Sequence, residues 1–102
     1  MVTKFQEKVY KLCKKIPEGK VITYKAIAEK LGTKAYRAVG TALAKNPYAP
    51  IVPCHRVVNS DGNVGNFSGK GGINGKIKML KKEGINIKNK KIDFEKFLFK
   101  FK

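Results

Sequence analysis

The chain has 102 residues, with 23 basic and 7 acidic side chains and a formal net charge of +16. This length suits one domain with a modest core, and 42% hydrophobic residues argue against a disordered chain. No apolar run approaches the roughly 18 residues needed to span a bilayer. The N-terminus also lacks the uninterrupted apolar segment of a secretory signal. We therefore expect a soluble, intracellular, cytoplasmic protein with no membrane partner.

The excess of positive charge has two readings. One is a solvated, Lys-rich surface, and the other is a polyanionic partner, of which nucleic acid is favoured because bound Lys and Arg release counterions. Charge alone does not choose between DNA, RNA and an anionic membrane. Arg37 and Arg56 are the only arginines. Since arginine offers a planar fork that Lys lacks, these two positions stand out, unless the bias reflects codon composition.

Two cysteines, Cys13 and Cys54, and one histidine limit the possible metal chemistry. An intracellular basic protein is not expected to hold a disulfide. Without a CxxC motif these residues make no credible zinc site, so we expect no metal. Cys13 flanks the apolar stripe of the first predicted helix and is interpreted as a structural thiol.

The first half of the chain predicts three helices. Apolar residues recur at helical spacing from Phe5 and indicate a helix over residues 3–16. Thr23 is a good N-cap for a second helix over 24–31. A third helix is expected over 34–45, ending before a proline. The second and third helices form a candidate helix-turn-helix, although an ordinary three-helix core is the alternative.

The third helix has two different faces. An apolar stripe is expected to pack inwards: Ala35, Val39 and Ala42. The other face combines basic flanks with small residues: Lys34, Arg37, Ala38, Thr41 and Lys45. Because its middle is small, this face can approach a nucleic-acid backbone closely, and we interpret it as the DNA-binding face.

The second half predicts loops, a hairpin and a further helix. Residues 47–53 contain three prolines and form an extended loop that ends at Cys54. A strand at 56–58, a turn at 59–63 and a returning strand from Val64 suggest a small β-hairpin wing. A glycine-rich loop precedes a helix over 75–83, in which Ile77 and Leu80 are expected to be buried. The Lys- and Phe-rich tail is either a last helix that packs its Phe residues or a partly disordered end. The fold class expected is mainly α, a winged helix-turn-helix-like single domain.

Cys54 lies in a setting that suits a nucleophile. His55 follows it directly, Arg56 is two residues away, and prolines make the approach rigid. The histidine could take the thiol proton directly or through a water, and its far nitrogen would then need a carboxylate. Glu83 is a plausible carboxylate partner. The alternative is a buried core thiol beside a surface histidine.

These residues resemble a known family, the O6-alkylguanine-DNA alkyltransferases, or methylated-DNA–protein-cysteine methyltransferases. Its active-site signature resembles Pro53-Cys54-His55-Arg56-Val57. Further motifs match in order and spacing: Gly19-Lys20-Val21-Ile22-Thr23-Tyr24, Arg37-Ala38-Val39-Gly40, Asn46-Pro47, Asn66-Phe67-Ser68-Gly69 and Glu83-Gly84. The resemblance covers about residues 5–87. It implies one catalytic and DNA-binding domain over residues 1–102, with a tail over 88–102.

The resemblance implies a role for each matching catalytic residue. Cys54 would accept the alkyl group irreversibly, so that each protein molecule acts once. His55 would be its base through a water, with Glu83 hydrogen-bonded behind it. Asn46 would brace the active-site turn. No cofactor is implied.

The resemblance also implies a double-stranded DNA partner, bound in the minor groove by a monomer. Tyr24 would press on the 3′ phosphate and help to rotate the nucleotide, and Arg37 would fill the gap left by the extruded base. The helix face around Arg37, defined above, would lie against the DNA. The guanine pocket would be lined by Val52, the backbone of Val57, Phe67, Ser68 and Gly69.

Three features depart from the family pattern. Phe67 stands where the family commonly has a Tyr whose hydroxyl helps to protonate guanine. The loop over 69–75 is longer than in some members. The additional N-terminal domain of many members, sometimes with zinc, is not expected, because the resemblance begins almost at residue 1.

Two other functions remain as alternatives. Alkyltransferase-like proteins have this fold and bind O6-alkylguanine to recruit excision repair, but they usually carry Trp in place of the Cys. The retained Cys54, His55 and Glu83 favour the enzyme over this non-catalytic protein. A winged-helix transcription regulator would leave the segment around Cys54 unexplained.

Overall fold

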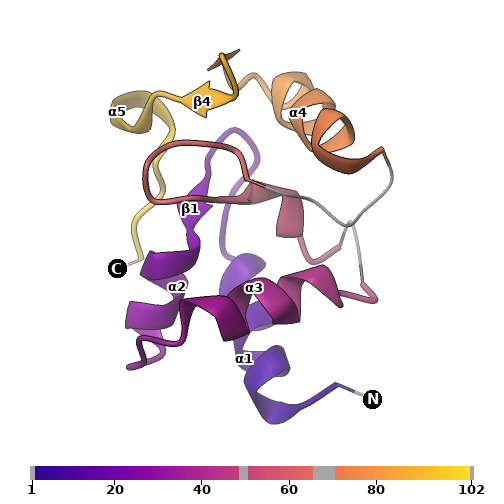
Figure 1. Cartoon of the computed structure of the whole chain (residues 1–102), viewed down its shortest axis with the longest axis vertical. Helices are drawn as coiled ribbons and strands as arrows, with labels where there is room; N and C mark the ends of the chain where they lie inside the picture. Colours follow the sequence, from indigo (N-terminus) through magenta and orange to yellow (C-terminus); the bar gives the residue numbers. More distant parts are fainter. Residues whose placement is uncertain (1, 49–50, 66–70, 102) are drawn as a thin grey trace.

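The computed structural model describes residues 2–48, 51–65 and 71–101, and it is mainly helical, as predicted (Figure 1). The helices of this part are α1 (Lys4–Cys13), α2 (Tyr24–Lys30), α3 (Tyr36–Ala44), the 3₁₀ turn η1 (Cys54–Arg56), α4 (Gly72–Lys82) and α5 (Phe94–Phe97). The strands are β1 (Ile22–Thr23), β2 (Val57–Val58), β3 (Ile87–Lys88) and β4 (Lys91–Ile92). No helix in the described ranges is long and apolar enough to cross a membrane.

Helix α1 begins at a capping box and ends earlier than predicted. The Thr3 hydroxyl accepts a hydrogen bond from the Gln6 amide at 3.1 Å, and the Thr3 amide donates to the Gln6 side chain at 2.7 Å. The expected helix over 3–16 stops at Cys13. The Ile16 amide bonds back only three residues, to the Cys13 carbonyl at 3.0 Å, so the last predicted residues form a tight turn before Pro17.

The second and third helices form close to their predicted positions. The Thr23 hydroxyl caps α2 by accepting from the Ala26 amide at 3.0 Å. Gly32, with φ +73°, ends that helix, because a left-handed residue costs glycine little. Helix α3 begins at Tyr36, later than expected. Ala35 is therefore an exposed N-cap residue and not part of the buried stripe.

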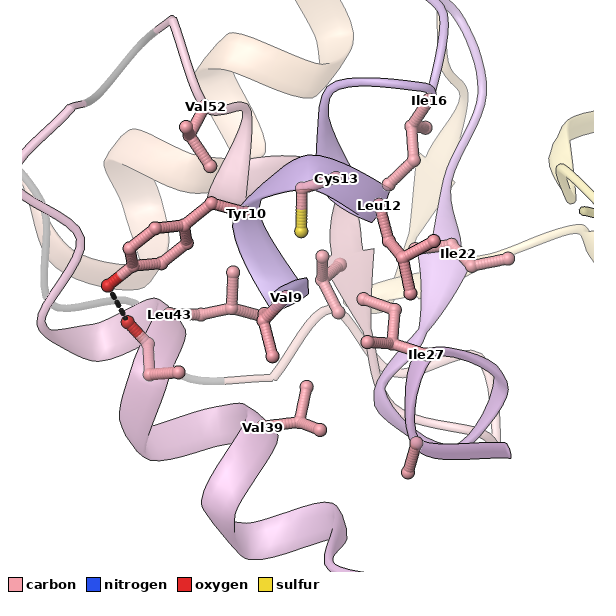
Figure 2. Packing of buried hydrophobic residues seen from close by; sticks show 13 residues of the cluster. Val9, Tyr10, Leu12, Cys13, Ile16, Ile22, Ile27, Val39, Leu43 and Val52 are labelled. Carbon is pink, nitrogen blue, oxygen red and sulfur yellow. Dashed lines mark hydrogen bonds between the residues drawn. The ribbon is translucent and has the colours of Figure 1, made fainter. Parts of the chain in front are cut away.

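The first hydrophobic cluster joins α1, α2 and α3 to the segment around residue 54 (Figure 2). Val9, Ile27 and Val39 are completely buried in it. The Tyr10 hydroxyl, also inside, donates to the Ala42 carbonyl at 2.6 Å. Cys13 is 0% exposed in the same cluster, which confirms that it is a buried thiol. This cluster is the rigid support behind the candidate site.

The predicted hairpin over 56–64 was wrong in its strand pairing. Strand β2 pairs in parallel with β1, with Ile22 opposite Val57. Parallel pairing is favoured because both strands are buried on both faces, which suits an internal strand pair better than an exposed wing. The expected turn does form, since the Asn59 amide bonds to the Asn63 carbonyl at 2.9 Å. Val64 then turns away, and its amide donates to the Lys90 carbonyl at 2.9 Å.

The tail forms a hairpin, a short helix and a docked strand. Strands β3 and β4 pair antiparallel, and Asn63 bridges to Lys91, so the 59–64 segment lies beside β4 (Figure 1). The expected last helix is confirmed only as the short α5. Its Phe94 and Phe97 pack on a second cluster with the buried core members Val21, Val58, Val64, Leu80, Ile85 and Ile92. The segment after α5 pairs with Val21 and returns to the first cluster.

Candidate active site and DNA-binding face

Cys54 is the first residue of η1 and is half-buried at the edge of the first cluster. A tight backbone turn presents it, because the Cys54 amide donates to the Val52 carbonyl at 2.8 Å. The Asn46 side chain holds the same turn from outside. Its Nδ2 donates to the Val52 carbonyl at 2.9 Å, and its Oδ1 accepts from the Tyr48 amide at 2.9 Å. The predicted contact of Asn46 with this turn is confirmed.

His55 and Glu83 form the pair that the sequence suggested. The His55 Nε2 atom lies 2.8 Å from Glu83 Oε2, and His55 is only 3% exposed. The alternative of a surface histidine is therefore wrong. Glu83 is the C-cap residue of α4, so the end of that helix carries the carboxylate to η1.

Helix α4 begins at Gly72, earlier than predicted. Leu80 is fully buried as expected, whereas Ile77 is only partly buried.

Arg56 has a role that its sequence position did not reveal. It donates to both carboxylate oxygens of Glu83, from Nε at 2.9 Å and from Nη2 at 2.8 Å. Its Nη1 donates to the Ile16 carbonyl at 2.9 Å, which ties the turn after α1 to η1. A bidentate pair of this kind fixes a carboxylate in both position and direction. The only sequence signal was that Arg56 is one of two arginines in a Lys-rich chain.

The electrostatics of this cluster determine which group holds the proton. Burial lowers the pKa of His55, and the hydrogen bond to Glu83 opposes this only in part. Burial would raise the pKa of Glu83, but the hydrogen bonds from Arg56 and His55 outweigh it and lower that pKa. At neutral pH a neutral imidazole therefore faces a carboxylate. An ionised carboxylate only accepts, so Nε2 carries the hydrogen and Nδ1 is left as the base.

Lys76 is a functional candidate that the sequence pattern did not single out. It is 0% exposed, and its ammonium donates to the Val57 carbonyl at 2.7 Å. The ammonium nitrogen also lies 5.9 Å from the centroid of the Tyr24 ring. Burial lowers the pKa of Lys76 to about 8, and the charge of Cys54 acts in the opposite direction. The overlooked signal was a Lys within the apolar stripe of α4, at helical spacing from Ile73 and Leu80.

Of the DNA-binding residues expected from α2 and α3, Tyr24 and Arg37 meet at a cleft of about 460 Å³. Its lining comes from α2, α3 and the 59–61 turn: Tyr24, Lys25, Tyr36, Arg37, Gly40, Asn59, Ser60 and Asp61. Burial raises the pKa of Tyr24 to about 12, so its hydroxyl stays protonated. The predicted basic face of the third helix is wholly exposed at Lys34, Arg37, Ala38, Thr41 and Lys45. Tyr36, 39% exposed, was not predicted as part of this face.

The predicted guanine-pocket residues are only partly brought together. Val52 is buried and lines a separate cavity of about 200 Å³ beside Tyr10 and Tyr48, not the larger cleft. The Val57 carbonyl accepts from Lys76, and a carbonyl oxygen has a second lone pair to offer. The remaining expected pocket residues, Phe67, Ser68 and Gly69, lie outside the described residues.

The described residues contain no group of three or more His, Cys, Asp or Glu side chains placed to hold a metal ion. Both cysteines are free thiols. The chemistry these residues offer is thus a thiol, a neutral base oriented by a carboxylate, and a buried ammonium. This set suits transfer of a group to sulfur.

Comparison with known proteins identifies relatives of this arrangement. Residues 4–85 match the family described as 6-O-methylguanine DNA methyltransferase, DNA binding domain. A methylated-DNA–protein-cysteine methyltransferase of Saccharolobus islandicus is 49% identical over 83 residues, which is 81% of this chain and 52% of that protein. The chain thus spans about half the length of the curated relatives it matches.

Two solved structures show the same fold. Mycobacterium tuberculosis OGT in complex with DNA has a TM-score of 0.75 and 44% identity, covering 79% of this chain and 50% of that one. S. pombe Atl1, in complex with damaged DNA containing O6-carboxymethylguanine, has a TM-score of 0.84 and 32% identity, covering 95% of each chain. Since the family model covers most of the sequence, the chain belongs to the 6-O-methylguanine DNA methyltransferase family.

Proposed function

We propose that the chain repairs O6-alkylguanine in DNA by moving the alkyl group irreversibly onto Cys54. The observation that carries this proposal is the base next to the thiol: a buried, neutral His55 whose far nitrogen is bonded to Glu83 at 2.8 Å. Relatives that match most of the chain are named methylated-DNA–protein-cysteine methyltransferases, which supports the same reaction. Cys13, buried and with its pKa raised by burial to about 12, does not compete as a nucleophile.

The reaction follows from the placement of these groups. The Nδ1 atom of His55 takes the thiol proton, directly or through a water, and the Glu83 carboxylate stabilises the resulting imidazolium. The sulfur then attacks the alkyl carbon, so an S–C bond forms as the C–O6 bond breaks and guanine leaves with the electron pair. The guanine anion then takes a proton, from the imidazolium of His55 or from water, which completes the balance. The thioether has no hydrolytic route back, which makes each molecule a single-turnover reagent.

Lys76 supports the thiolate from inside the protein. Its ammonium group is buried, and with a pKa of about 8 it is mostly charged at neutral pH. A positive charge in a low-dielectric site stabilises a nearby anion more than the same charge would in water. We assign Lys76 a positioning and electrostatic role, because it also fixes the Val57 carbonyl beside the active-site turn.

The DNA partner is proposed to lie over the cleft between α2, α3 and the 59–61 turn. Arg37 would enter the duplex from the minor groove and replace the extruded base, while Tyr24 would support the rotated phosphate. Two similar structures, of OGT and Atl1, are complexes with DNA, which supports DNA as the partner. We further propose that the chain acts as an intracellular monomer. Phe67, Ser68 and Gly69 would complete the guanine pocket beside the backbone of Val57, with Val52 packed behind it.

We also propose that the chain forms one catalytic and DNA-binding domain. The family model ends at residue 85, yet the tail contributes Phe94 and Phe97 to the second cluster. It also contributes Phe99 and Phe101 to the first cluster. The tail is therefore part of the packed unit and not an appendage to a core that ends at residue 87.

A non-catalytic binding protein is the second candidate, and one observation favours it. The Atl1 structure matches this chain over 95% of its length, more than the 79% matched by the OGT structure. Such a protein would bind O6-alkylguanine in DNA and recruit excision repair without transferring anything. The retained cysteine, with its oriented base, favours the enzyme.

The two candidates differ in the mass of the protein after reaction. We would incubate the chain with duplex DNA containing O6-methylguanine and measure the intact protein by mass spectrometry. The enzyme gains one methylene mass located at Cys54, and the binding protein binds tightly without a gain. Cys54→Ala should abolish the gain, whereas the matched control Cys13→Ser should keep it. Methyl transfer that persists in Cys54→Ala would overturn the site assignment.

A further inference from the structure

The β3–β4 hairpin packs against the second hydrophobic cluster and carries a concentration of positive charge. Three of its residues are exposed lysines: Lys88, Lys90 and Lys91. The structure shows two ion pairs within residues 2–48, 51–65 and 71–101, and neither involves these lysines. The hairpin lies beyond the part of the chain that the family model matches, which ends at residue 85.

The pairing within this hairpin places like charges opposite each other. Lys88 and Lys91 are direct cross-strand partners in the β3–β4 register. Like charges placed directly opposite each other destabilise a strand pair. Lys90 has φ +62°, a left-handed conformation that favours glycine and is uncommon for Lys. The sequence thus places three exposed lysines on one short hairpin at a cost to the hairpin itself, and a bound polyanion would offset the repulsion between the paired lysines.

The hairpin is continuous with the face on which the DNA is proposed to lie. Asn63 bridges to Lys91, and the Ile92 amide donates to the Gly62 carbonyl at 2.9 Å. The residues just before Gly62, Ser60 and Asp61, line the 460 Å³ cleft with residues of α2 and α3. In Figure 1 the loop that follows β2 lies between α3 and β4. The 59–63 segment therefore connects the cleft at α2 and α3 with the strand that carries Lys91.

Gly62 shows how closely the two segments approach. Its φ is +92°, and a Cβ placed there would lie 3.2 Å from the Ile92 carbonyl oxygen. Glycine is thus needed for the 59–64 segment to lie against β4. This close packing fixes the hairpin relative to the 59–61 turn that lines the cleft.

We propose that Lys88, Lys90 and Lys91 form a second DNA contact, which binds the phosphate backbone beside the lesion and takes the place of the wing predicted at 56–64. This inference rests on the proposed function in one respect, that duplex DNA is the partner. The contact reads no bases, because Lys binds phosphate as a point charge. It adds affinity and salt dependence to DNA binding, and it plays no part in the chemistry at Cys54.

The test compares two triple variants that lose the same charge. One carries Lys88→Gln, Lys90→Gln and Lys91→Gln, and the control carries Gln at three exposed lysines of α1: Lys4, Lys8 and Lys11. Affinity for an undamaged duplex is measured across salt concentrations. For every phosphate that the protein no longer neutralises, the negative slope of log affinity against log salt becomes shallower by about 0.9. The slope of the hairpin variant should fall by about 1 to 3, and that of the α1 control by much less.

Further measurements separate this proposal from the proposed function. Both triple variants should react with free O6-benzylguanine at the wild-type rate, and Lys→Arg at the three hairpin positions should keep the wild-type slope. If the wild type repairs and binds DNA but the slope falls equally in the two triple variants, the hairpin assignment is wrong and the repair function stands. If the wild type gains no mass yet the slope falls only in the hairpin variant, the repair function fails and the hairpin contact stands.

Discussion

The Nε2 atom of His55 lies 2.8 Å from Oε2 of Glu83, and the carboxylate is itself held by two hydrogen bonds from Arg56. The pair thus has a fixed direction, with the unprotonated nitrogen turned away from the carboxylate. His55 comes from η1 and Glu83 from the end of α4, so the folding of α4 supplies the carboxylate that orients His55 as a base.

Glu83→Gln should slow alkyl transfer by about 10²-fold, in line with the typical contribution of a positioned base. A neutral amide neither stabilises an imidazolium nor fixes which nitrogen of His55 carries the hydrogen. The measurement is the rate of mass gain with free O6-benzylguanine, which isolates chemistry from DNA binding. Glu18→Gln, an exposed position before β1, is the matched control and should react normally. A wild-type rate in Glu83→Gln would remove the carboxylate from the mechanism.

Arg56→Lys should lower the free energy of unfolding by about 1–3 kcal/mol, because one ammonium cannot replace a bidentate pair and the bond to Ile16. Urea denaturation measures the loss. The pKa of Glu83 is lowered below its ordinary value of 4.5, so its stabilisation is present above that pH and is lost as the pH falls through the folded value. The difference in free energy of unfolding between Arg56→Lys and wild type should therefore become smaller in acid.

The other arginine supplies the control for this measurement. Arg37 is exposed on α3, and Arg37→Lys should change stability by no more than about 0.5 kcal/mol. Equal losses in Arg56→Lys and Arg37→Lys would mean that the bidentate pair contributes little to the fold.

Lys76→Met should stabilise the protein at neutral pH while slowing alkyl transfer. Burial lowers the pKa of Lys76 from 10.5 to about 8, so folding at pH 7 must bury a charge. The pKa of Lys76 is lower in the folded protein than in the unfolded chain. The free energy of unfolding is therefore not reduced by this group above pH 10.5, where Lys76 is neutral in both states, and it decreases as the pH falls through about 8. Removing the charge should therefore gain about 1–3 kcal/mol at pH 7, after the lost bond to Val57 is deducted.

Urea denaturation checks the stability part of the Lys76 prediction, and the rate of mass gain with free O6-benzylguanine checks the slower transfer. Urea denaturation of Lys76→Met and wild type should show a difference that shrinks between pH 8 and pH 10.5, the interval set by the two pKa values. The exposed neighbour in α4, Lys78→Met, is the matched control and should show no such dependence. A Lys76→Met protein that is less stable than wild type at pH 7 would show that the hydrogen bond outweighs the buried charge.

Local signals predicted the helices of this fold well, and they failed where distant contacts decide. Thr23 and Gly32 marked the ends of α2 because capping depends only on neighbouring residues. The pairing of β2 with β1 could not be predicted in this way. Strands of two residues carry no alternation to read, and both partners of a parallel pair are placed by the two hydrophobic clusters. The β3–β4 hairpin was missed because its turn, Asn89-Lys90, lacks the glycine of the common signal.

The residues of the candidate site also fall into those that the sequence predicted and those that only distant contacts reveal. Motif spacing pointed to Cys54, His55 and Glu83, and the expected contact between the last two is confirmed. Arg56 and Lys76 act through contacts with Ile16 and Val57, which no spacing in the sequence reveals. A buried Lys also contradicts the usual surface position of that residue, so the sequence pattern gave no reason to single out Lys76.

Arg37 allows the extrusion of the base to be separated from the chemistry at Cys54. Arg37 is exposed and lines the cleft with Tyr24. Arg37→Ala should therefore slow repair of O6-methylguanine in duplex DNA by about tenfold or more, the effect of losing an interaction of about 1.4 kcal/mol in the flipped state. Its reaction with free O6-benzylguanine should match wild type, because a free base needs no extrusion.

A matched variant distinguishes loss of this finger from simple loss of charge. Lys34→Ala removes one exposed charge beside α3 and should weaken duplex binding uniformly, lowering the salt slope by about 0.9. At DNA concentrations that saturate both variants, Lys34→Ala should recover the wild-type rate while Arg37→Ala stays slow. Full recovery of Arg37→Ala at saturation would leave Arg37 as one more phosphate-binding cation, and base extrusion would then have to depend on Tyr24 or Tyr36, the aromatic residues of the same cleft.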